Sequence, residues 1–248
     1  MNILIPIAGS NTTTDDSQYI KSLYEIEHKI VFQYIYESLS NIPDADFIVI
    51  LKREDVKNFH FDDTIRLMIP NVKIIVTEDS TKGSACSCLL AVDYIDNDRP
   101  LLISGCDQLV TRDWNRILPE FQLKNVDGGV VYFDAVHPKW SYVKLNAEGL
   151  VVEAAEKRPI SRNATTGQYY YRKGSDFVYA AEEMIRKDAS VNGQYYVCPT
   201  FNEMVLKQKK ILAYQIPQEE YFSFKDQKGM DEYEDYLKRR KSECGSQN

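Results

Sequence analysis

The amino-acid sequence predicts an α/β fold, with a mixed, mainly parallel sheet flanked by helices. Up to about residue 105, apolar segments of strand length alternate three times with helical ones, which is typical of parallel strands joined by right-handed crossovers. After Asp107, strands separated by turn signals follow one another before helices return. No Pro-, Gly- or Ser-rich linker divides the 248 residues. We therefore expect one domain over residues 1–240 and a C-terminal tail over 241–248.

The first half contains four apolar segments with three helical segments between them. Ile30, Tyr34 and Leu39 recur at roughly helical spacing and predict an amphipathic helix. The third helical segment begins at a run of small residues. The expected strands span residues 2–7, 46–51, 72–77 and 100–105, and the expected helices span 29–40, 54–69 and 84–95.

The second half begins with strands whose turn residues are recognisable. Residues 146–149 carry the signals of a hairpin turn, and Ser175 is in the right place to cap a helix. The expected strands span residues 127–135, 140–157, 164–173 and 211–216, and the expected helices span 174–188, 201–210 and 230–241.

Composition excludes several classes of function. A formal net charge of -7, with basic residues interleaved among acidic ones, argues against a nucleic-acid partner. The N-terminal apolar segment is too short for membrane insertion and has no basic leader, so we expect a cytoplasmic protein. Five cysteines without CxxC spacing indicate reduced thiols, and Cys86 and Cys88 are expected to be small, buried or half-buried helix residues.

Two loops in the first half have the composition of anion-binding turns. Ala8, Gly9 and Ser10 follow the first strand, with Lys21 further along as a point charge. Lys82 and Gly83 follow the third strand and open a helix. Either loop alone is equally typical of an ordinary polar connection. Because both would lie at the same edge of the sheet, together they indicate a polyphosphate ligand.

Asp107 ends the fourth strand at that edge. A charged side chain at the end of an apolar strand needs a cation, a metal ion or solvent. The alternative is a solvated loop aspartate. A carboxylate beside phosphates is what Mg²⁺ requires, so we expect Asp107 to hold this metal.

Glu156 and Lys157 form an acid–base pair at the end of another strand. Such a pair is often a solvated strand end, but in a sugar site the carboxylate accepts hydrogen bonds from hydroxyls and the ammonium neutralises a phosphate. Arg162 lies near enough in sequence to join them. The tyrosines of residues 168–173 and 193–199 indicate core packing or, alternatively, a stacking wall for a ring.

Nucleophilic hydrolysis has no support, because the chain lacks a G-x-S-x-G elbow and a Cys–His pattern.

Six stretches together resemble the sugar-phosphate nucleotidyltransferases, and more closely a branch found with bacterial capsule and surface-polysaccharide genes. The resemblance covers roughly residues 2–215. It implies a Rossmann-like fold of the type shared with GT-A glycosyltransferases, with a nucleotide-binding half to about residue 110 and an acceptor-binding half over 111–240. The stretches are MNILIPIAG, YIKSLYEI, LLISGCDQLV, HPKWSYVKLNAEGLVVEAAEKRPIS, ATTGQYYYRKGSDFVYAAEEMI and VNGQYYVCPTFNEMV.

The resemblance implies a reaction in which a nucleoside triphosphate and a sugar phosphate, or another small phosphate, are joined with release of pyrophosphate. It also admits a homodimer. Phosphoryl transfer of this kind depends on positioning and charge neutralisation. The implied roles are nucleotide contact for Ala8, Gly9, Ser10, Lys82 and Gly83, catalysis for Lys21 and Asp107, acceptor contact for Glu156, Lys157 and Gly167, and Mg²⁺ binding for Asp107 with Asp226 as a candidate second ligand.

The loop after the first strand departs from the family pattern. It reads GSNTTTDDSQ, whereas the family commonly has G-x-G-x-R, and Asp15 and Asp16 add negative charge. Two other functions therefore stay open. One is a GT-A glycosyltransferase that uses a finished nucleotide sugar, although Gly105 stands where the first acid of its D-x-D motif would be. The other is a nucleotide-binding pseudoenzyme or assembly partner in a polysaccharide pathway.

Overall fold

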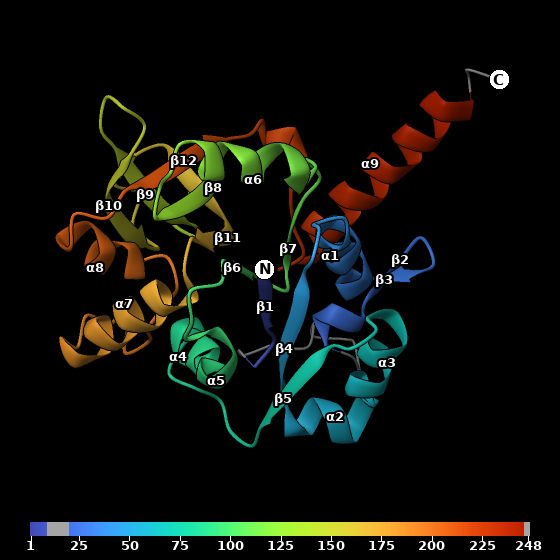
Figure 1. Cartoon of the computed structure of the whole chain (residues 1–248). Helices are drawn as coiled ribbons and strands as arrows, with labels where there is room; N and C mark the ends of the chain where they lie inside the picture. The colour runs from blue at the N-terminus through green and yellow to red at the C-terminus, as the bar shows by residue number, and fades with distance from the viewer. Residues whose placement is uncertain (9–19, 246–248) are drawn as a thin grey trace.

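A nine-stranded mixed sheet forms the centre of the molecule, in the order β10-β9-β11-β6-β1-β4-β5, with β8 paired to β11 and β12 paired to β8. The computed structural model of the chain describes residues 1–8 and 20–245, with side chains up to Ser242. Figure 1 shows helices on both sides of this sheet. The predicted fold class is confirmed.

The parallel part of the sheet consists of the four strands expected in the first half. β1 (Asn2–Pro6) lies between β4 (Asp46–Lys52) and β6 (Leu101–Ser104), and β5 (Lys73–Thr77) forms the edge beyond β4. Side chains of β1 alternate between two cores: Ile3 packs with α1 and α6, and Leu4 packs with α4 and α7. Both faces are therefore covered, which explains why these strands are almost continuously apolar.

The helices of this half are shorter than expected. The segment 54–69 divides into α2 (Arg53–Phe59) and α3 (Phe61–Met68), because His60 has a left-handed φ of 49°. The segment 84–95 divides into α4 (Ser84–Leu89) and α5 (Val92–Ile95). α1 (Val31–Ser40) starts two residues late, since β3 (Lys29–Ile30) pairs with β2 (Glu25–Ile26).

The second half adds antiparallel strands to the same sheet. β11 (Asn163–Tyr171) pairs with β6, β8 (Gly128–Asp134) and β9 (Ser141–Leu145), and β12 (Ile211–Gln215) runs parallel to β8. β9 and β10 (Val151–Glu156) form the expected hairpin. The expected strand 140–157 is thus two strands with the 146–149 turn between them, and the Asn146 amide donates to the Leu150 carbonyl at 2.9 Å.

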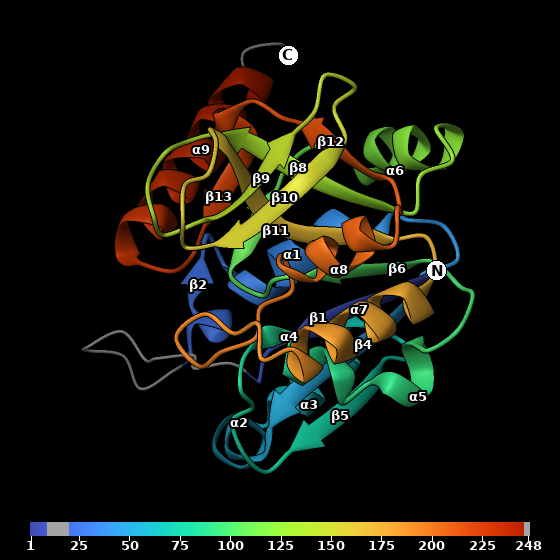
Figure 2. The ribbon, with the colours of Figure 1, turned by 90° about the vertical axis from the view of Figure 1, so that its left-hand side faces the viewer.

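Helices α7 (Gly174–Arg186) and α8 (Thr200–Leu206) cover the same face as α4 and α5 (Figure 2). The prediction that Ser175 caps this helix is wrong. The residue before α7 is Lys173, and the Ser175 amide donates a hydrogen bond to the Asn97 carbonyl at 3.0 Å. α9 begins at Gln227 and continues to Gly245, past the expected start of the tail (Figure 1). Besides β2 and β3, the elements that were not expected are α6 (Trp114–Leu123), β7 (Gln108–Val110), β13 (Tyr221–Ser223) and the short 3₁₀ helices η1 (Lys21–Leu23) and η2 (Gln218–Glu220).

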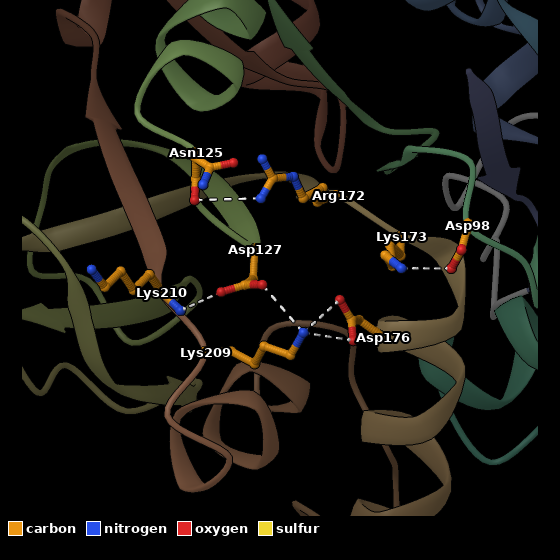
Figure 3. Close-up of polar contacts among 8 residues, drawn as sticks. All are labelled: Asp98, Asn125, Asp127, Arg172, Lys173, Asp176, Lys209 and Lys210. Carbon is orange, nitrogen blue, oxygen red and sulfur yellow. Dashed lines mark hydrogen bonds and ion pairs between the residues drawn. The ribbon is translucent and has the colours of Figure 1, made fainter.

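An ion-pair network fixes the start of α7 to β8 and β12 (Figure 3). The Lys209 ammonium lies 3.2 Å from Asp127 and 3.3 Å from Asp176, and the Lys210 amide donates to the other Asp127 oxygen at 2.9 Å. Asp176 lies in the first turn of α7, where the helix dipole also stabilises a negative charge.

The tyrosines at residues 169–171 and Tyr195 are buried, so core packing rather than a stacking wall accounts for them. Among the described helices, none combines the length and apolar character needed to cross a membrane.

Candidate active site

The carboxyl end of β6 is the centre of the candidate site. After Ser104 the chain turns through residues 105–107 and continues as β7, which pairs with β13 from the C-terminal part of the chain. The Phe224 amide donates to the Asp107 carbonyl at 2.8 Å. The chain around residue 224 is therefore held directly beside Asp107, although more than a hundred residues separate them in sequence.

One lysine lies beside Asp107, and a second lysine contacts the backbone of the first. The Lys225 ammonium is 4.0 Å from the Asp107 carboxylate and 5.8 Å from the centre of the Trp140 ring. The Lys21 ammonium donates to the backbone carbonyl of Lys225. Lys21 could be identified from the sequence. Lys225 could not, since only the pairing of β7 with β13 brings it to the site.

Glu156 approaches the same region from the end of β10. The Ser141 hydroxyl donates to its carboxylate. Partial burial raises the pKa of Glu156, while the Ser141 hydrogen bond and the charges of Lys225 and Lys157 act in the opposite direction. The two acids, Asp107 and Glu156, thus both lie within the field of Lys225.

Lys157 is turned away from its neighbour in sequence by a left-handed φ of 53°. Its ammonium donates to the Tyr196 hydroxyl at 3.0 Å and lies 5.0 Å from the centre of that ring, and this hydrogen bond raises the pKa of Lys157. Arg162 does not join the pair, because its guanidinium binds Asp134, with one N–O distance of 2.9 Å. The expectation that Arg162 joins Glu156 and Lys157 is wrong.

A cavity of about 570 Å³ adjoins Glu156 and Lys157. Its size falls in the range of small-molecule sites. The other walls come from the chain after α7 and from α8, including Asn192, Asn202 and Glu203. Asn202 is fixed by two hydrogen bonds of 2.8 Å to the backbone of Ala154.

Gly167 lies at the bulge of β11 and packs against the turn after β6. Its φ is 80°, and a Cβ at this position would lie 1.9 Å from the Gln108 side-chain oxygen. The Gly167 carbonyl accepts a hydrogen bond from Gly105 at 3.0 Å. Any other residue here would strain the backbone and displace the Gln108 side chain, so glycine favours the close approach of β11 to the Asp107 turn.

Gly83 connects the two halves of the chain. The Tyr195 amide donates to the Lys82 carbonyl at 2.8 Å, and the Ala85 amide donates back to the Tyr195 carbonyl at 3.0 Å. A Cβ on Gly83, whose φ is 105°, would lie 2.3 Å from that carbonyl. The Lys82 side chain is exposed beside this contact.

Ala8 is fully buried just beyond β1, whereas Gly9 and Ser10 lie outside the described residues. Asp15 and Asp16 also lie outside them.

Asp226 serves α9 at its N-terminus. Its carboxylate accepts a hydrogen bond from the Gly229 amide at 2.9 Å, as an N-terminal cap does. The side chain lines a second cavity, of about 830 Å³, together with Trp140 and Tyr236.

The donor set at Asp107 suits magnesium. In the described part of the chain, no three acidic, histidine or cysteine side chains form a complete metal cage. Mg²⁺ needs only one or two carboxylates when phosphates and water complete its shell. The Asp107 side chain is 28% exposed, and the nearest cation paired with it in the described residues is the loosely held Lys225. The site fits a metal that arrives with a phosphate ligand.

Cys106, between Gly105 and Asp107, is not a nucleophile. Desolvation, with the Asp107 charge second, raises the pKa of its thiol to about 12. The thiol therefore stays protonated at neutral pH.

The family model for nucleotidyl transferases matches residues 17–215, which include Lys21, Asp107 and Glu156. The chain belongs to the nucleotidyl transferase family. No curated protein matches the sequence.

Solved structures of other nucleotidyl transferases share the fold. A nucleoside-diphosphate-sugar pyrophosphorylase from Vibrio cholerae RC9 is 24% identical, with a TM-score of 0.77 over 95% of this chain and 99% of that one. A putative glucose-1-phosphate thymidylyltransferase from Bacillus anthracis is 16% identical, with a TM-score of 0.71 over 95% and 94%. An inositol-1-phosphate CTP transferase from T. maritima is 11% identical, with a TM-score of 0.72 over 92% and 90%.

Proposed function

We propose that this nucleotidyl transferase joins a nucleoside triphosphate to a sugar phosphate or a similar small phosphate and releases pyrophosphate. The observation that carries the proposal is the convergence of Asp107, Lys21 and Glu156 around Lys225, with a cavity suited to a small acceptor adjoining Glu156. The names of the structural neighbours support the same class of reaction.

Mg²⁺ bound through Asp107 would neutralise charge on the triphosphate. Of the two proposed metal ligands we favour Asp107, because the Asp226 carboxylate already caps α9. Lys21 would stabilise negative charge that develops at the reacting phosphate, in the manner of a positioned donor. Its present partner, a backbone carbonyl, is neutral and readily exchanged.

The nucleotide would contact Ala8, Gly9 and Ser10 of the first loop and Lys82 and Gly83 of the second. The acceptor would occupy the cavity at Glu156, with Lys157 for its phosphate and Gly167 at its sugar. Glu156, held by Ser141, is placed to accept hydrogen bonds from sugar hydroxyls. No protein nucleophile is needed, since the acceptor phosphate attacks the α-phosphorus directly.

The test is pyrophosphate release from CTP, UTP, dTTP, ATP and GTP, each paired with a panel of sugar phosphates and with and without Mg²⁺. We expect one pair to turn over, and EDTA to stop it. Asp107→Asn should lose turnover while retaining its fold. Tight nucleotide binding without turnover of any pair would contradict the proposal and favour the pseudoenzyme. Release of nucleoside diphosphate from a nucleotide sugar would favour the glycosyltransferase.

We infer from the resemblance of the six stretches that the reaction takes place in the cytoplasm and supplies precursors for capsule or another surface polysaccharide.

A further inference from the structure

The backbone of Lys225 is fixed on both sides. The preceding residue, Phe224, donates its amide to Asp107, and the following residue, Asp226, caps α9. The Lys225 carbonyl itself accepts from Lys21. The position of the Lys225 side chain at the site is therefore set by the fold.

The ammonium of Lys225 is held much more loosely than its backbone. The distance of 4.0 Å to Asp107 is at the limit of an ion pair, and the side chain is 41% exposed. Pairs of this kind are worth little and exchange readily. Lysine also has a flexible stem of four carbons, so its charge can be moved without the backbone.

Stability of the C-terminal junction does not require this pair. β7 and β13 are joined by their backbone ladder, and the Thr111 amide adds a bond of 2.9 Å to the Glu220 carbonyl. Arg112 also pairs with Glu220 through two hydrogen bonds of 2.6 Å. These bonds hold the junction without any contribution from the Lys225 charge.

We propose that Lys225 is a ligand-binding cation that neutralises Asp107 in the free site and passes to a substrate phosphate when a divalent cation binds Asp107. The inference rests on the proposed function. A divalent cation and an ammonium at one carboxylate repel each other, and a polyphosphate offers the displaced ammonium a better partner. Lys225 thus competes with the metal ion for Asp107 and contributes a positive charge to the binding of the phosphate.

This competition predicts that removing the Lys225 charge strengthens metal binding and weakens anion binding. In Lys225→Gln, Mn²⁺ alone should bind about fivefold more tightly, because its competitor is gone. Inorganic pyrophosphate without metal should bind about tenfold more weakly, because a cation is lost. Both are measured by titration calorimetry on the full chain. Lys225→Arg keeps the charge and should stay close to wild type.

Lys228→Gln is the matched control. It removes the same charge three residues away, from an 84% exposed lysine paired with Glu232 at 3.7 Å. It should leave both affinities unchanged. Thermal melting of each variant separates a loss of fold from a loss of charge.

The inference is overturned if Lys225→Gln binds both probes as wild type does, or binds both more weakly. A wild-type chain that releases no pyrophosphate with any pair of substrates contradicts the proposed function. The changes in affinity for Mn²⁺ and pyrophosphate still decide the role of Lys225 in that case.

Discussion

At the scale of single residues, Glu156 carries the clearest functional prediction. Glu156→Gln keeps the size of the side chain and an oxygen for the Ser141 hydroxyl, but loses the charge. A hydrogen bond to a charged group is worth about 1.5–3 kcal/mol, so the KM for the acceptor should rise about tenfold or more. The KM for the nucleotide should stay unchanged in steady-state kinetics.

Glu153→Gln is the control for this change. Glu153 lies on the same strand, but it is 42% exposed and paired with Arg158. An equal loss in both variants would exclude a special role for Glu156.

The protonation of Glu156 also affects stability. Burial raises the pKa of Glu156 in the folded chain, so the folded state favours the protonated side chain. The contribution of Glu156 to the free energy of unfolding is therefore complete below about pH 4 and is lost as the pH rises through the raised pKa. Glu156→Gln should therefore gain stability relative to wild type between pH 4 and pH 8. Urea midpoints at the two values test this, and a relative loss at pH 8 would show that the fold favours the carboxylate.

At the scale of elements, the bulge of β11 is the feature that shapes the site. Gly167→Ala combines a strained φ with a Cβ that would lie 1.9 Å from Gln108. We expect a loss of about 2 kcal/mol or more in the free energy of unfolding, together with lower activity. Equilibrium unfolding in urea measures the first effect.

Gly149→Ala separates the two causes. Gly149 has a similar φ of 76°, and its Cβ would meet nothing within 4 Å. This variant should lose only about 1 kcal/mol, which is the cost of the backbone conformation alone. Equal losses would mean that the Gln108 contact relaxes freely.

Elements with strong local signals could be predicted, and those that depend on distant pairing could not. The four parallel strands are largely apolar, so their positions in the chain and the location of Asp107 at the end of the fourth one followed from the sequence, whereas their order in the sheet did not. By contrast, β7 and β13 have three residues each, and neither carries a distinctive pattern without its partner. The break at His60 was also hidden, since histidine has no general preference for a left-handed φ comparable to that of glycine.

The same reasoning applies to the site. Gly83 stood out because it opens a helix after a turn of small residues, and Glu156 and Lys157 because they end a strand. Gly167 was implied only by the family resemblance. Lys225 is one of many lysines in a charged C-terminal region. Only its contact with Asp107 distinguishes it, and that contact depends on the fold around residues 221–226.

At the scale of the whole molecule, ligand binding should stabilise the fold by mass action. A nucleoside triphosphate with Mg²⁺ at a hundred times its Kd adds about 2.7 kcal/mol. For a chain of this length that corresponds to a rise in Tm of roughly 5–10 °C. Thermal melting should show the rise with the nucleotide that turns over, and EDTA should reduce it.

Asp107→Asn serves as the comparison for this measurement. It should retain the melting temperature of the free wild-type chain and lose the part of the rise that depends on magnesium. A rise that is the same in wild type and variant, with or without EDTA, would mean that Asp107 holds no metal.

The hydrogen bond between Phe224 and Asp107 has a consequence for how these proteins diverge. The family match ends at residue 215, before the segment that this bond attaches to the site. The match to the family model therefore carries no information about the residue that stands beside the carboxylate. On the role inferred for Lys225, a relative with a neutral residue at this position should bind a divalent cation more tightly and a polyphosphate without metal more weakly.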